Sequence, residues 1–239
     1  MTDKKDLTPS PPAATSRAMI DSFLDQTKRV PAVTETTARL VFALDATMSR
    51  QPTWDLACRV QSEMFDAAAG IGGLAVQLVY FRGFNECRSS GWVVQPRALT
   101  DLMTRIECRG GQTQIGRVLR HVAGEARRSS VRVMVFVGDA MEEPVDQLCA
   151  VAGELGLLGV KVFMFHEGHD PAAGQAFQEI ARLTGGAYAR FDASAPNALR
   201  DLLQVAATYA AHGVDGITRL AGRSSAARGL LTSMKGRSR

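Results

Sequence analysis

Short apolar runs alternate along the chain with longer amphipathic stretches. Four runs that are apolar at nearly every position are typical of strands covered on both faces: residues 40–44, 74–81, 131–137 and 160–165. Two shorter strands are expected at 91–94, near a sheet edge, and at 187–191. The pattern therefore predicts six strands.

Helical patterns fill the gaps between these strands. They cover residues 54–69, 96–106, 114–127, 144–158, 172–183 and 196–211. Gly70, Gly159 and Gly185 stand where a glycine commonly ends a helix. Strands that alternate with helices predict an α/β fold, with a doubly wound, mostly parallel six-stranded sheet and helices on both faces in three α/β/α layers.

The two ends of the chain differ in composition from its middle. Residues 1–35 are predicted to be a disordered segment, rich in Pro, Ser and Thr at its start, with one short amphipathic helix over 18–28. The main domain is expected over 36–218, and 219–239 is expected to be a basic, flexible tail.

The net charge of +4 is concentrated in this tail. Residues 219–239 hold six Lys and Arg and no acid, which leaves −2 on the remaining residues, so nucleic acid is an unlikely partner. The four cysteines form no CxxC pair, as expected for reduced thiols in a cytoplasmic protein. No secretory leader and no apolar run of membrane-spanning length occur, so no membrane association is expected.

Oxygen-bearing side chains gather where predicted strands end. Asp45, Thr47 and Ser49 alternate on the loop that leaves the first strand, Thr113 follows a Gly-Gly-Gln turn before a helix, and Asp139 follows the strand 131–137. In such sheets ligands bind beyond the carboxyl ends of the strands. Hard oxygen ligands suit Mg²⁺ or Mn²⁺, so these five residues are predicted to form a metal site.

The three segments DATMS, GGQTQIG and VFVGDA resemble the metal-ion-dependent adhesion site of the von Willebrand factor A (integrin I-like) family. The resemblance implies a bacterial-type protein-interaction module that is not an enzyme. In that family an acidic side chain of a protein partner completes the coordination shell of the metal. The partner, the pathway and the oligomeric state are not specified by the sequence.

Several residues near the predicted metal loops have other possible roles. Trp54 follows the metal loop and is a candidate for partner contact at the rim, although core packing is the simpler account. His166 and His169 in HEGH lack the spacing of a zinc-protease helix. Glu142 and Glu143 are expected to be solvated or to favour the start of the following helix.

Two other functions fit parts of the sequence. A phosphatase of the haloacid-dehalogenase kind would also use an aspartate such as Asp45 with Mg²⁺, but it needs a second acid two residues later, where this chain has Thr47. The other alternative is a von Willebrand A scaffold with an inactive metal site, which metal titration would distinguish.

Overall fold

The computed structural model describes residues 37–51, 54, 74–192 and 196–235. The predicted N-terminal segment 1–35, almost all of the predicted helix 54–69, and Gly70 lie outside the described residues.

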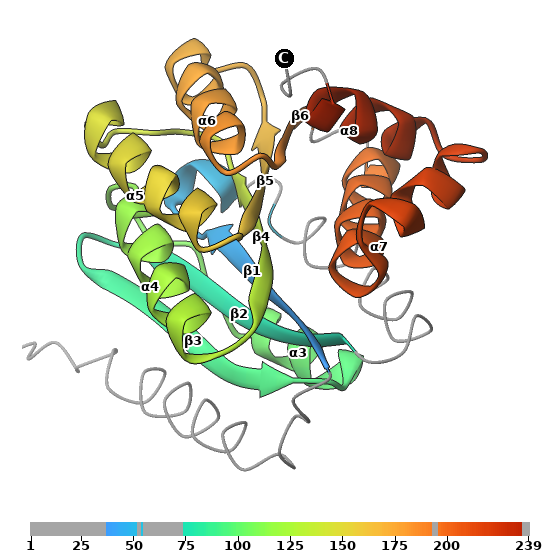
Figure 1. Cartoon of the computed structure of the whole chain (residues 1–239). Coiled ribbons are helices and arrows are strands. Elements are labelled where there is room, and N and C mark those ends of the chain that lie inside the picture. The colour runs from blue at the N-terminus through green and yellow to red at the C-terminus, as the bar shows by residue number, and fades with distance from the viewer. Residues whose placement is uncertain (1–36, 52–53, 55–73, 193–195, 236–239) are drawn as a thin grey trace, which may run out of the picture.

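The core is a single six-stranded sheet (Figure 1). Its strands are β1 (Ala38–Asp45), β2 (Leu74–Arg82), β3 (Glu86–Val93), β4 (Val131–Gly138), β5 (Lys161–Glu167) and β6 (Ala187–Phe191). They are arranged in the order β3-β2-β1-β4-β5-β6, with only β3 antiparallel to its neighbour. The predicted mostly parallel, doubly wound sheet is confirmed. Its strand order reverses beside β1, and α/β sheets bind ligands at such a switch point.

Helices cover both faces of the sheet (Figure 1). One face packs against α4 (Ile115–Arg128), α5 (Val145–Leu157) and α6 (Pro171–Leu183). The other packs against α3 (Pro96–Met103), α7 (Pro196–Ala221) and α8 (Ser225–Lys235). Among the described residues, no helix combines the length and apolar character of a membrane span.

The alternation of side chains along β1 explains the two cores. Val41 and Ala43 lie in the cluster with α4, α5 and α6, whereas Leu40, Phe42 and Leu44 lie in the cluster on the opposite face. All five side chains are buried, as expected for a central strand that is apolar at successive positions. This continuous apolar run then ends abruptly at Asp45.

The C-terminal region differs from the flexible tail expected over 219–239. Helix α7, which is kinked at Gly213, continues to Ala221, and α8 packs against α7 and β6. The spacing of Ala227, Leu230 and Leu231 places all three on one helical stripe, and all three are buried. Burial of this stripe provides the hydrophobic stabilisation that the Gly/Ser/Arg-rich composition did not suggest.

The predicted helix-ending glycines are confirmed at two positions. Gly159 follows α5 with φ +77°, and Gly185 follows α6 with φ +60°. A side chain would be strained in this left-handed conformation, so glycine is favoured at both turns.

Candidate metal site

The first loop of the candidate site leaves β1 at the switch point. Asp45 is fully buried, and its Oδ1 accepts a hydrogen bond of 2.8 Å from the backbone N–H of Thr47. The hydroxyls of Thr47 and Ser49 lie 3.1 Å apart, at the start of a short 3₁₀ turn, η1 (Met48–Arg50). The loop thus runs from a buried carboxylate at Asp45 to an exposed hydroxyl at Ser49.

The second loop is held against the first by backbone contacts. The N–H of Arg109 donates to the carbonyl of Ala46 at 3.0 Å, and Arg109 pairs with Thr47 in an isolated parallel bridge. A β-carbon at Gly111 would lie 2.1 Å from the backbone of Gly83, so only glycine allows this close approach. These contacts place the second loop at the carboxyl ends of β1 and β2, and Thr113 in this loop is buried.

The third loop closes the arrangement. A β-carbon at Gly138 would lie 3.3 Å from Cβ of Asp45, so Asp139 begins its loop directly beside the first one. Farther along, the backbone N–H of Glu142 donates to Thr113 Oγ1 at 3.0 Å, and the Thr113 N–H donates to Glu142 Oε2 at 3.0 Å. Each of the three predicted loops therefore contacts the other two.

Two buried carboxylate oxygens in this region have no hydrogen-bond partner among the described residues. These are Asp45 Oδ2 and Asp139 Oδ1. Burial raises the pKa of Asp45 to about 6; the Asp139 charge adds to the rise, while hydrogen bonds from Thr47 and the Arg50 charge oppose it. Buried charges are costly unless they are paired or bind a metal.

The donor set fits a hard divalent cation. Two carboxylates and three hydroxyls offer the oxygen chemistry that Mg²⁺ and Mn²⁺ prefer. The described residues contain no group of three or more His, Cys, Asp or Glu side chains arranged for a metal ion. Any metal bound at these three loops would therefore depend on the hydroxyls of Thr47, Ser49 and Thr113 as well as on the two aspartates.

A buried ion pair lies directly behind the first loop. Arg50 Nη2 lies 2.6 Å from Glu167 Oε2, and Arg50 Nη1 donates to the carbonyls of Val137, at 3.2 Å, and Asp45, at 3.4 Å. Arg50 thus joins the carboxyl ends of β1, β4 and β5. The sequence analysis did not identify Arg50 or Glu167, because they are 117 positions apart and no short motif contains both.

Glu142 and Glu143 stabilise the preceding helix rather than the following one. The Glu143 carboxylate accepts the backbone N–H groups of Ile115 and Gly116, at the start of α4. Burial raises the pKa of Glu143, and these two hydrogen bonds oppose the rise. The two glutamates therefore connect the second and third loops; Glu142 is exposed, as expected, whereas Glu143 is partly buried.

Trp54 does not lie at the rim, so the prediction that it contacts a partner is corrected. Its side chain is 4% exposed, its Nε1 donates to the Ile106 carbonyl at 2.9 Å, and the Arg50 guanidinium lies over its ring. A tryptophan with a buried hydrogen-bond partner packs stably in a core. Met48, which is 52% exposed, is the apolar side chain that the first loop presents to solvent.

The two histidines of HEGH lie in different environments. His166 is buried within β5, where its Nδ1 lies 3.0 Å from the Tyr188 hydroxyl and burial lowers its pKa. His169 is exposed on the loop that follows. The structure thus places His166 inside β5 and His169 on the loop that follows it, so neither lies on a helix.

Comparison with known proteins identifies the fold. No protein-family model matches the sequence, and no curated protein matches it. Among solved structures, the VWA domain of SpRpn10 is similar with a TM-score of 0.55 at 11% identity, over 68% of this chain and 95% of that one. The chain has the von Willebrand A fold.

Two bacterial neighbours support the same assignment. The vWF domain of the type V pili tip protein Mfa5 from Porphyromonas gingivalis has a TM-score of 0.55 at 10% identity, over 72% of this chain and 95% of that one. The PilB minor pilin from Streptococcus sanguinis has a TM-score of 0.55 at 12% identity, over 76% of this chain and 63% of that one. At these identities the likeness establishes the von Willebrand A fold alone.

Proposed function

We propose that this von Willebrand A-type chain is a non-enzymatic protein-interaction module that recruits or assembles partner proteins through Mg²⁺ or Mn²⁺. The metal would be held by Asp45, Thr47, Ser49, Thr113 and Asp139. The observation that carries the proposal is the pair of buried carboxylate oxygens, Asp45 Oδ2 and Asp139 Oδ1, without partners among the described residues. A bound cation would satisfy both oxygens and offset their desolvation.

The expected partner carries an acidic side chain. Two aspartates and three neutral hydroxyls leave a divalent ion electrophilic enough to attract a further carboxylate. Ser49 and Met48 are exposed, so the first loop is open to solvent at the end away from Asp45. A partner carboxylate would approach from this side, with Met48 as an apolar contact beside it.

Partner capture that depends on both the metal and Asp45 tests the proposed function. Wild type and the Asp45→Asn variant would be immobilised and exposed to a lysate, in Mg²⁺ or in EDTA. We expect wild type to retain at least one partner in Mg²⁺, and to lose it in EDTA and in the variant by about tenfold or more. Asp215→Asn, an equivalent change at an exposed position of α7, is the matched control and should capture like wild type.

Retention of the same partners in EDTA and by Asp45→Asn would contradict metal-dependent recruitment. A haloacid-dehalogenase-like phosphatase is disfavoured because Asp45 exposes none of its surface to an incoming phosphate ester. Thr47 also replaces the second acid that such an enzyme uses for proton transfer. Phosphatase turnover that disappears in Asp45→Asn would favour that enzyme instead.

A further inference from the structure

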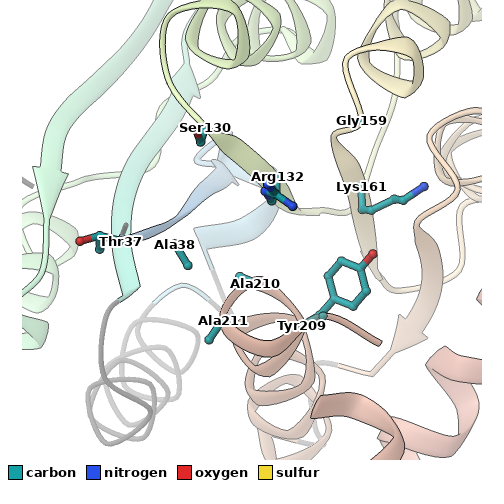
Figure 2. Close-up of a pocket in the computed structure, with 10 residues that line it drawn as sticks. Thr37, Ala38, Ser130, Arg132, Gly159, Lys161, Tyr209, Ala210 and Ala211 are labelled. Carbon is teal, nitrogen blue, oxygen red and sulfur yellow. The ribbon is translucent and has the colours of Figure 1, made fainter. Parts of the chain in front are cut away.

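A second candidate site lies at the opposite edge of the sheet from the three loops. A cavity of about 530 Å³ opens at the amino ends of β1, β4 and β5, beside the part of α7 that leads into its kink at Gly213 (Figure 2). Its volume is within the range of roughly 300–1,000 Å³ that is usual for small-molecule sites. Its described lining includes polar side chains, which are those of Thr37, Ser130, Arg132, Lys161 and Tyr209.

Arg132 reaches the cavity because of an irregularity in β4. Arg39 of β1 is paired with Val131, and the next residue, Leu40, is paired with Val133, so Arg132 is the extra residue of a bulge. It is the exposed residue of β4, whose other positions are buried. Bulges commonly redirect one side chain beside a functional site.

Lys161 and Tyr209 also line the cavity. Lys161 is the first residue of β5 and is paired with Val133, next to the bulge. Its ammonium group lies beside Gly185, where a β-carbon would be 2.7 Å from Nζ, and the side chain extends away from Arg132 (Figure 2). The Tyr209 ring packs edge-on against Phe163 at 5.5 Å between centroids, and its hydroxyl points toward the strand edge where Lys161 emerges (Figure 2).

The charges of this cavity are not balanced within the part of the chain that the structure describes. The described lining residues include two cations and no carboxylate. None of the ion pairs found among the described residues involves Arg132 or Lys161. Two cations in one concave site attract anions from solution.

We infer that this cavity binds a small organic phosphate monoester. The guanidinium of Arg132 matches the oxygens of a phosphate group, and Lys161 adds a mobile second charge. Tyr209 and Ser130 add neutral hydroxyl donors; burial raises the pKa of Tyr209, so its hydroxyl stays protonated at neutral pH. The Tyr209 ring and the small side chains of Ala38 and Ala210 leave apolar surface for the organic part of the ligand.

Calorimetric titration of the full chain tests this site. The probes are adenosine 5′-monophosphate, inorganic phosphate and adenosine, all in EDTA so that no metal at the other edge of the sheet can bind phosphate. We expect the monophosphate to bind, and Arg132→Gln and Lys161→Gln each to weaken it by roughly tenfold or more. Tyr209→Phe, which keeps the ring, should weaken it several-fold.

Arg219→Gln is the matched control, because Arg219 is an exposed cation of α7 that does not line this cavity, and it should bind like wild type. If inorganic phosphate binds as tightly as the monophosphate, the anion site is supported and its ligand is free phosphate. Equal affinity for adenosine, an absence of monophosphate binding, or unchanged affinity in both Arg132→Gln and Lys161→Gln would overturn the inference. The thermal midpoint of each variant shows that it is folded.

Discussion

Replacing Arg50 with methionine is expected to lower the free energy of unfolding by about 3–5 kcal/mol. Arg50 is 1% exposed, and its loss leaves the Glu167 carboxylate buried without the cation 2.6 Å away. The change also removes the hydrogen bonds to the carbonyls of Asp45 and Val137. Urea denaturation at pH 7 measures the difference, which is large against the 5–15 kcal/mol that is typical of a whole domain.

A surface ion pair is the control for Arg50. Arg182 pairs with Glu179 through exposed side chains, so Arg182→Met should leave the free energy of unfolding nearly unchanged. The double variant Arg50→Met/Glu167→Met removes both charges and should recover most of the loss. An Arg50→Met effect as small as that of Arg182→Met, or a double variant no more stable than the single one, would contradict the role given to the buried pair.

Asp45→Asn is expected to stabilise the metal-free protein at pH 7 by about 1–3 kcal/mol. A pKa of about 6 in place of 3.8 corresponds to about 3 kcal/mol of destabilisation by the ionised carboxylate. Asparagine removes this charge and its repulsion with Asp139, and its Oδ1 still accepts the Thr47 N–H. The expected gain in stability is smaller than about 3 kcal/mol at its lower end because the side-chain amide of asparagine needs hydrogen-bond partners of its own.

The pH dependence of this difference follows from the direction of the pKa shift. The folded-state pKa of Asp45 is raised, so the native state keeps the Asp45 proton to a higher pH than the unfolded chain does. The contribution of this group to stability is therefore lost as pH rises from about 4 through 6. Urea denaturation in EDTA should show the variant and wild type nearly equal near pH 4, with the variant more stable above pH 6. A variant less stable than wild type at pH 7 would mean that the Asp45 charge is already compensated within the chain.

The parts of the fold with a strong local pattern were predictable. β1, β2, β4 and β5 are buried on both faces, so their apolar runs stand out in the sequence. The antiparallel edge strand β3 is longer than the predicted 91–94, because half-exposed residues such as Glu86 and Arg88 interrupt any apolar run. Helix α8 was missed because its apolar stripe is short and lies among residues typical of flexible tails.

The candidate site was predictable where its residues share a short segment. Asp45, Thr47 and Ser49 stand at alternate positions, Thr113 directly precedes a predicted helix, and Asp139 closely follows a predicted strand. The contacts among their three loops are consistent with one site, and metal binding by these residues stays a prediction. Arg50 and Trp54 follow the same loop, but their burial depends on Glu167 and Ile106, which are distant in the sequence. Such tertiary contacts leave no local signal.

Calorimetric titration of Mg²⁺ and Mn²⁺ into wild type and Asp45→Asn shows whether the three loops hold a divalent cation. If the oxygens of the three loops share one cation, wild type should bind a single ion, Asp215→Asn should bind it equally, and Asp45→Asn should lose binding although it is folded and more stable. An absence of binding by wild type, or the same affinity in Asp45→Asn, would contradict the metal site and leave a von Willebrand A scaffold that acts without one.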